Sequence, residues 1–196
     1  MASDGFVLST TIIFWIALAV LVFWALGAYN RLVGLRGQLL RQLQALTAQW
    51  QANAQALRQA LADLSRVPET DSAWASLGDE ASSWRPLGQA TKQFQACVGA
   101  VAAKSHVVPP VDDMASVRAA HAVMEGAWQR LVNTSDDLAG QAVPQSLALL
   151  WQHQQMQIQE KLRDYNTSAQ LYNQSVRQFP AVLIGWIFGF GTAQVL

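Results

Sequence analysis

The sequence predicts an all-α protein in which an N-terminal transmembrane helix continues into an antiparallel helical bundle of three long helices plus short helices. Three observations predict this class. An uncharged apolar run occupies Phe6–Ala28, apolar residues beyond it recur every three or four positions, and no sustained period-two alternation indicates a strand. The prediction divides the chain into residues 1–5, 6–28, 29–179 and 180–196.

The composition narrows the class of protein before any motif is considered. Of the 196 residues, 52% are hydrophobic and only 13% are charged, and the 13 basic and 13 acidic side chains cancel. This balance argues against a nucleic-acid partner, because binding phosphates needs a clear basic excess. The single cysteine, Cys97, excludes an intrachain disulfide framework and a cysteine-based zinc cluster.

Phe6–Ala28 is the predicted transmembrane helix. Its 23 uncharged residues are enough to cross a hydrocarbon core of about 30 Å at 1.5 Å per residue. Trp15 lies within the span, and Trp24 lies near the end where interfacial tryptophans collect. A cleaved signal peptide is the rival interpretation. Residues 1–5 contain no lysine or arginine, however, and the apolar run is longer than a typical signal.

Basic residues set the expected orientation. Arg31, Arg36 and Arg41 follow the span, and five arginines against one acid give residues 29–66 a formal charge of +4. Residues 67–137 hold five basic and nine acidic side chains, a charge of −4. The positive-inside rule predicts that residues 1–5 lie outside and the bundle lies in the cytoplasm. We expect the three arginines to contact lipid headgroups.

The same helix is predicted to continue far beyond the membrane. No proline occurs before Pro68, and apolar residues recur at steps of three and four, which is the pattern of one amphipathic helix. The predicted buried stripe consists of Leu32, Leu35, Leu39, Leu43, Leu46, Trp50, Ala54, Leu57, Leu61 and Leu64. A rod of about 60 residues would be about 90 Å long.

A short helix and three further helices are expected after this rod. Residues 67–86 are rich in turn formers and have room for one short helix near Thr70. A second helix is predicted over Pro86–Ser105, ending before the breaker Pro109–Pro110. A third begins at Asp112 or Asp113 and buries an apolar face made of Met114, Val117, Ala120, Met124, Trp128, Leu131 and Leu138.

The fourth helix is expected to begin near Gln145 and to end at Pro180. Its buried stripe is interrupted by the polar Gln154 and consists otherwise of Leu147, Trp151, Ile158, Leu162, Tyr165, Ala169, Tyr172, Val176 and Phe179. Three Tyr-Asn pairs begin at Tyr29, Tyr165 and Tyr172. If the first and fourth helices are antiparallel, the chain returns beside Tyr29. We expect these tyrosines, with Phe179 and Pro180, to pack the bundle; a dedicated partner surface is the alternative.

Residues 180–196 form an apolar tail that contains no charged residue. As a helix the tail is too short to cross a bilayer comfortably, so a surface-lying or shallowly inserted segment is expected. So large an apolar patch indicates a membrane contact or an oligomer interface. The residues expected there are Val182, Leu183, Ile184, Trp186, Ile187, Phe188 and Phe190. Packing on the transmembrane helix and docking on neighbouring subunits both remain open.

YNRLVGLR follows the predicted span at Tyr29–Arg36, and DYNTSAQLYNQSVRQFPAVLIGWIFGF lies at Asp164–Phe190. These two stretches resemble the LemA family of bacterial membrane-anchored helical proteins. The resemblance implies an N-terminal anchor with the N-terminus outside, a cytoplasmic helical bundle and no known enzymatic activity. Some relatives are implicated in organising internal membranes, and others are encoded near membrane peptidases.

The chain departs from the family pattern after the span. Where relatives carry a Lys-Arg-Arg cluster, this sequence has Gln51, Ala52 and Asn53, and Arg58 stands in place of a proline. Leu46 and Gln49 keep the family's residue types. The resemblance therefore indicates a divergent member.

No catalytic or metal-binding motif is found. The three histidines, His106, His121 and His153, are far apart and lack metal-ligand spacing, so we expect no metal, no cofactor and no enzymatic activity. Cys97 lies on an apolar helix face, which is typical of a small core residue.

We expect a protein of the bacterial inner membrane that self-assembles laterally as a scaffold and organises or curves the bilayer. Its partners would be lipid and further copies of itself. The alternative is an adaptor that recruits a membrane peptidase or a signalling protein. A domain secreted after signal cleavage is a third interpretation.

Overall fold

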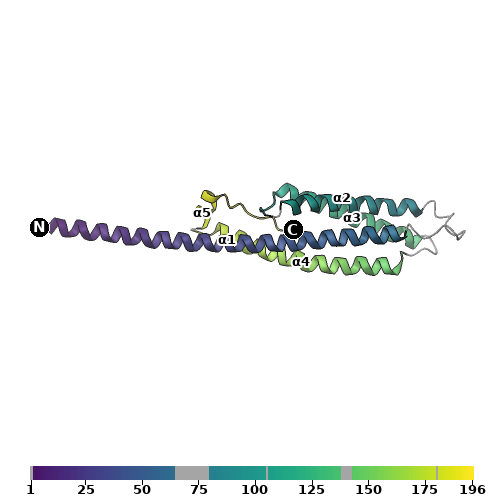
Figure 1. Ribbon diagram of the computed structural model, residues 1–196, viewed down its shortest axis with the longest axis horizontal. Coiled ribbons are helices and arrows are strands. Elements are labelled where there is room, and N and C mark those ends of the chain that lie inside the picture. Colours follow the sequence, from purple (N-terminus) through teal and green to yellow (C-terminus); the bar gives the residue numbers. More distant parts are fainter. Residues whose placement is uncertain (1, 65–79, 105, 138–142, 180) are drawn as a thin grey trace.

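The structure is a computed structural model that describes residues 2–64, 80–104, 106–137, 143–179 and 181–196. Its described residues form five helices and no strand, which confirms the predicted all-α class. The molecule is elongated, with the N-terminal half of the first helix projecting alone from a helical bundle (Figure 1). The predicted short helix near Thr70 lies outside the described residues, as do Pro180 and Leu138.

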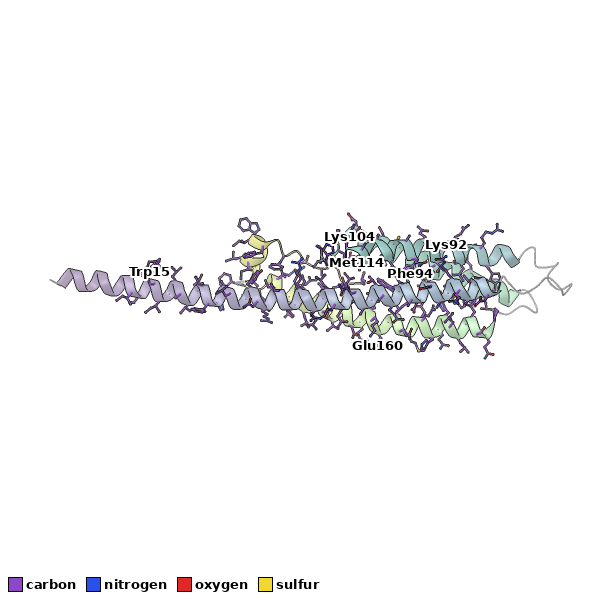
Figure 2. The ribbon with its side chains drawn as sticks, viewed as in Figure 1. Trp15, Lys92, Phe94, Lys104, Met114 and Glu160 are labelled. Atoms are coloured by element: carbon purple, nitrogen blue, oxygen red, sulfur yellow. The ribbon has the colours of Figure 1, made fainter. Side chains whose placement is uncertain are left out.

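Helix α1 (Ala2–Leu64) is a single uninterrupted helix of 63 residues. At 1.5 Å per residue it is about 95 Å long, so the predicted rod is confirmed. Its projecting half carries Trp15, labelled in Figure 2, whose side chain is 61% exposed. The half inside the bundle buries one apolar stripe: Leu32, Leu39, Leu43, Leu46, Trp50, Ala54 and Leu57. Leu35 and Leu61 are partly buried.

Helices α2 (Glu80–Ala103) and α3 (Val111–Asp137) form a hairpin that packs on α1 through α2. A salt bridge of 2.8 Å joins Lys104 to Asp113 across the turn. Helix α2 begins before Pro86, not at it as predicted. Pro86 is the seventh residue of α2 and removes the backbone hydrogen bond that its N–H would donate to the Ser82 carbonyl, and Glu80 places negative charge at the helix N-terminus, where it is favourable.

The predicted apolar face of α3 is buried throughout its described part: Met114, Val117, Ala120, Met124, Trp128 and Leu131. Aromatic pairs connect the helices. Trp50 of α1 meets Phe94 of α2 edge to face, with ring centroids 6.0 Å apart. Trp128 of α3 stacks on Trp151 of the next helix at 4.6 Å. Such pairs contribute about 0.5–1.5 kcal/mol beyond the area they bury.

Helix α4 (Gln145–Arg177) runs back alongside α1 (Figure 1). It ends two residues before Phe179, which was predicted on its buried stripe. Gln178 is extended, with φ −83° and ψ 141°, and Phe179 precedes a proline, a position that disfavours the α conformation. The Phe179 side chain is therefore 70% exposed, and the prediction that it packs inside the bundle is wrong.

Buried amides fix the position of α4 on α1. Asn53 Nδ2 donates to the Gln154 carbonyl at 3.3 Å, and Gln154 Nε2 donates to the Asn53 carbonyl at 3.2 Å. Gln49 Nε2 donates both to Asn53 Oδ1 and to Gln157 Oε1, each at 2.9 Å. Buried polar groups need such partners, so the polar interruption of the α4 stripe and the departure at Asn53 belong to one hydrogen-bonded cluster.

Helix α5 (Ala181–Phe188) follows α4 and packs against both α1 and α4. Beyond it the chain is extended and folds back along the bundle, toward the turn between α2 and α3 (Figure 1). We call residues 181–196 the tail and residues 189–196 its extended segment.

Candidate functional site

Aromatic contacts hold the tail, and Phe179 just before it, against the middle of α1. The Phe179 ring lies 5.3 Å from that of Trp24, and the Phe188 and Phe190 rings lie 5.1 Å and 6.1 Å from that of Tyr29. Tyr29 is half-buried there. The tail thus meets α1 at the end of the predicted membrane span, close to Ala28.

One face of α5 remains exposed and is entirely apolar. Trp186 is 86% exposed, and it is accompanied by Val182, Leu183, Ile187 and Phe188. We call these five residues the apolar face. Such a patch of contiguous apolar side chains on a surface indicates a membrane or protein contact.

Two residues predicted for this interface lie elsewhere. Ile184 is buried against the chain's own bundle, which corrects its assignment to an external interface. A one-sided helix must bury some positions, and Ile184 lies three residues after the buried Ala181. Phe190 is partly buried against the core.

The exposed apolar surface continues along the projecting half of α1. Within the described residues, α1 is the one helix long and apolar enough to cross a membrane. Its exposed side chains between Ile12 and Leu26 are apolar and include Trp15 and Trp24. Phe6 belongs to the same helix, but its side chain lies outside the described ones. This helix suggests an N-terminal membrane anchor.

The three arginines predicted to contact headgroups follow the span at increasing distance, and Arg41 lies about 20 Å beyond Ala28 at helical rise. Arg31 and Arg41 are exposed on α1, whereas Arg36 is partly buried. The Arg36 guanidinium lies 5.6 Å from the centre of the Phe190 ring, within the range of a cation–π contact. Arg36 therefore helps hold the tail, a role that its position in the sequence did not indicate.

Two asparagines of α4 bind the backbone of the extended segment. Asn173 Nδ2 donates to the Ala193 carbonyl, and the Ala193 N–H donates to Asn173 Oδ1, both at 2.7 Å. Asn166 Nδ2 donates to the Leu196 main-chain oxygen at 2.7 Å, and the Leu196 N–H donates to Asn166 Oδ1 at 2.8 Å. Each amide thus pairs with one residue as a neighbouring strand would. We call Asn166 and Asn173 the asparagine clasp.

The spacing of the clasp matches the two backbones. Seven residues of helix between Asn166 and Asn173 rise about 10.5 Å. Three extended residues between Ala193 and Leu196 rise about 10 Å. Residues seven apart also lie on nearly the same side of a helix, so both amides face the segment.

A buried tyrosine precedes each asparagine of the clasp on α4. Tyr165 and Tyr172 are fully buried, and the Tyr165 hydroxyl donates to the Gln194 carbonyl at 2.9 Å. Burial raises the pKa of Tyr165 to about 12. Burial also raises the pKa of Tyr172, while the positive charge of Arg36 acts in the opposite direction. Both hydroxyls are therefore protonated at neutral pH.

A glycine turn joins α5 to the extended segment. Gly189 has φ +68°, a left-handed conformation that side chains with a Cβ rarely adopt. The Phe190 N–H donates to the Gly185 carbonyl at 2.9 Å, which caps the helix end. This turn directs the chain from α5 back toward the clasp.

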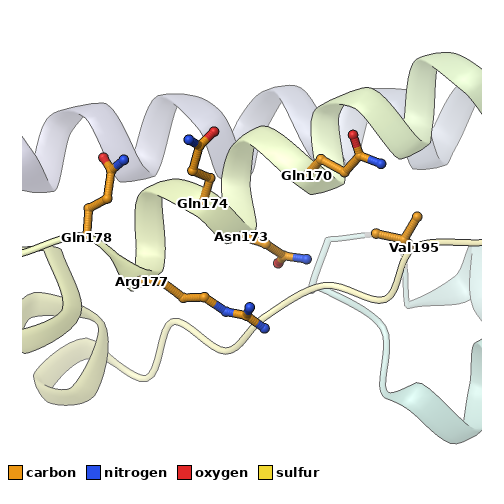
Figure 3. Close-up of a pocket in the computed structure, with 6 residues that line it drawn as sticks. All are labelled: Gln170, Asn173, Gln174, Arg177, Gln178 and Val195. Atoms are coloured by element: carbon orange, nitrogen blue, oxygen red, sulfur yellow. The ribbon is translucent and has the colours of Figure 1, made fainter.

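An open groove of about 590 Å³ lies beside the clasp (Figure 3). Its lining comes from α4, from Gln178 just after α4 and from the extended segment: Gln170, Asn173, Gln174, Arg177, Gln178 and Val195. Arg118 of α3 donates to the Val195 carbonyl at 3.3 Å. The extended segment therefore lies between α4 and α3.

His121, His153 and Cys97 make contacts elsewhere in the bundle. No group of three or more His, Cys, Asp or Glu side chains in the described part of the chain could hold a metal ion. His121 packs its ring edge to face on Phe94, and burial lowers its pKa, against the opposing effect of Glu125. His153 contacts Gln157, and Cys97 is partly buried against the core.

Comparison with known proteins gives one match. No curated protein and no solved structure matches the chain. The sequence model of the LemA family matches residues 88–196, more than half of the chain. The matched region includes α3, α4, the asparagine clasp and the whole tail, which agrees with the resemblance of Asp164–Phe190. The chain belongs to the LemA family.

Proposed function

We propose that this protein is a non-enzymatic scaffold of the bacterial inner membrane, which associates laterally and organises or curves the bilayer. Residues 1–5 lie outside, residues 6–28 span the membrane and the bundle lies in the cytoplasm. The tail rests in the headgroup region of the inner leaflet. The apolar face of α5 contacts lipid and neighbouring copies.

The position of the apolar face is the observation that carries this proposal. It stays exposed beside Tyr29, which Phe188 contacts, at the end of the apolar surface of α1. An apolar helix face in such a position enters a leaflet by about 5–10 Å. Arg31, exposed close to the end of the span, favours anionic headgroups by about 1 kcal/mol.

Insertion into one leaflet connects this geometry to membrane shape. Helix α5 adds volume to the inner leaflet only, because the outer leaflet is crossed by α1 alone. Many copies side by side would then expand one leaflet relative to the other and bend the bilayer. The long bundle of each copy holds neighbours apart on the cytoplasmic side. Such a device needs no catalytic group.

The experiment replaces exposed apolar residues of α5 by aspartate. Trp186→Asp and Ile187→Asp are compared with Leu149→Asp, because Leu149 is also exposed, at 57%, but lies on α4 away from the tail. Particle mass after mild solubilisation and the curvature of vesicles containing each protein are measured. We expect the two tail variants to stay in the membrane but to lose large assemblies, whereas Leu149→Asp keeps them.

Large assemblies and vesicle curvature unchanged in both tail variants would refute the scaffold. A wild-type protein recovered as a monomer bound to a membrane peptidase would instead favour the adaptor.

A further inference from the structure

We propose that the tail is exchanged between neighbouring copies, so that the asparagine clasp of one copy holds the extended segment of the next. Tail exchange rests on the proposed scaffold function and supplies its link between copies. The asparagine clasp then binds residues 189–196 of a second copy of this chain.

The first support is that the clasp recognises backbone. All four hydrogen bonds of Asn166 and Asn173 go to main-chain atoms of the extended segment, as do those of Tyr165 and Arg118. An identical segment from a neighbour offers the same N–H and carbonyl groups. The clasp therefore makes the same bonds in either arrangement, which is the condition for exchanging an element at low cost.

The second support is that the tail is a separate unit. It follows α4 after only residues 178–180, and its contacts lie along one strip of surface formed by α1, α4 and Arg118 of α3. At one end are the rings of Tyr29 and the Arg36 guanidinium, and at the other the clasp. A neighbour presents this entire strip in the same orientation, because α1 of every copy enters the membrane in the same direction.

A short connection also favours exchange. Short hinge loops invite the exchange of an element between copies, and only residues 178–180 join α4 to α5. Gln178 is already extended, with ψ 141°. Anchoring confines all copies to one plane, which raises their effective concentration.

Tail exchange gives each copy one donor and one acceptor. A contact in which one surface meets a different surface of the next subunit does not close on itself at two copies unless the rotation permits it. Copies that stand side by side in the membrane and each pass the tail to the next copy therefore form rows or rings. The apolar face of α5 then lies at each junction between copies, where it contacts both lipid and protein.

The first experiment uses single cysteines on the two sides of the groove. Gln170 of α4 and Val195 of the tail both line it (Figure 3). In a Cys97→Ser background, copies carrying only Gln170→Cys are expressed together with differently tagged copies carrying only Val195→Cys. Membranes are treated with a short bismaleimide. We expect a product containing both tags.

The matched control tests whether this product depends on the clasp. Asn166→Asp and Asn173→Asp place a carboxylate against a carbonyl, while Asn133→Asp makes the same change at an exposed position of α3. Because each clasp amide makes two hydrogen bonds to the extended segment, we expect the mixed product to fall on the order of tenfold or more in either clasp variant. The Asn133 variant should give the wild-type yield.

A second experiment avoids cross-linking. One copy carries an intact tail with both clasp asparagines changed to aspartate, and the other keeps the clasp but lacks residues 181–196. Alone, neither can exchange tails. Together, we expect a one-to-one complex after mild solubilisation, since the first supplies the tail and the second supplies the clasp.

Two results would overturn tail exchange: no mixed product in membranes where the double variant Gln170→Cys/Val195→Cys is cross-linked within one chain, or no complex from the complementary copies. The particle mass of the wild-type protein separates this failure from that of the scaffold. Large wild-type assemblies without mixed product refute exchange alone, whereas a monomeric wild-type protein refutes both.

Discussion

Replacing Asn173 by alanine tests how strongly the clasp holds the extended segment. Asn173→Ala removes both hydrogen bonds to Ala193. At about 1 kcal/mol each, the loss is about 2 kcal/mol, so the population of the released segment rises about thirtyfold. The double variant with Asn166→Ala removes all four bonds and about 4 kcal/mol. Hydrogen exchange of the backbone amides measures this release directly.

The amides of Ala193 and Leu196 are the reporters, because each donates to a clasp side chain. In Asn173→Ala the Leu196 amide keeps its own acceptor, Asn166. We nevertheless expect faster exchange at Leu196 as well, because the two asparagines hold one continuous segment. Asn133→Ala is the control and leaves both rates unchanged.

Unchanged exchange at Ala193 in Asn173→Ala would refute the assignment of the clasp. Faster exchange at Ala193 with no change at Leu196 would show that the two asparagines act independently, which would contradict the cooperative part of the reasoning.

Three further predictions concern stability, measured by denaturant unfolding of the full-length protein in detergent unless stated. The pKa of Tyr165 rises to about 12 in the folded protein. Its contribution to the free energy of unfolding is therefore fully present below the unfolded pKa of about 10 and is lost between pH 10 and 12, where the unfolded chain loses the proton first. The loss is about 3 kcal/mol and disappears in Tyr165→Phe; equal pH profiles for both proteins would contradict it. Leu43→Ala opens a cavity at a fully buried position and costs about 2–5 kcal/mol, whereas Leu149→Ala, at an exposed site, changes little. Gly189→Ala strains a left-handed residue by about 1–2 kcal/mol and speeds amide exchange in the tail, but Gly191→Ala, with open space around it, does not; equal effects would contradict this.

The helices could be predicted because their burial repeats with the helical period. The stripe from Leu32 to Leu57 and the face of α3 from Met114 to Leu131 each bury one side of a helix, so spacing alone identifies them. Helix ends were less accurate. The first turns of α2 carry no apolar period, so the sequence placed the start at Pro86 rather than at Glu80.

The asparagine clasp could not be predicted from periodicity. Asn166 and Asn173 lie beside the buried stripe, and their partners lie 20 to 30 residues further along the chain. A side chain that binds a distant backbone leaves no local repeat. The available signal was the recurrence of Tyr-Asn seven residues apart. That recurrence predicts tyrosine packing, which explains Tyr165 and Tyr172 but not the asparagines that follow them.

The buried amides between α1 and α4 illustrate the same limit. Gln154 was recognised as a polar residue within an apolar stripe, but its partner, Asn53, lies on another helix. Asn53 was identified only as a departure from the family's basic cluster. Pairing the two requires the relative position of α1 and α4, which depends on the packing of the whole bundle.

Because α1 is unbroken, a tilt of its proposed membrane-spanning part also moves the distal end of the bundle. Residues 29–64 belong to the same helix as the proposed anchor and extend about 54 Å beyond it. A tilt of about 20°, typical of membrane-spanning helices, moves the far end sideways by about 18 Å. A thinner bilayer increases the tilt, so we expect the spacing between distal ends of neighbouring bundles to change with membrane thickness. Distances between spin labels at the distal end, measured in bilayers of two thicknesses, would read out this coupling. A change in bilayer thickness would thereby become a sideways movement of the distal end of the bundle.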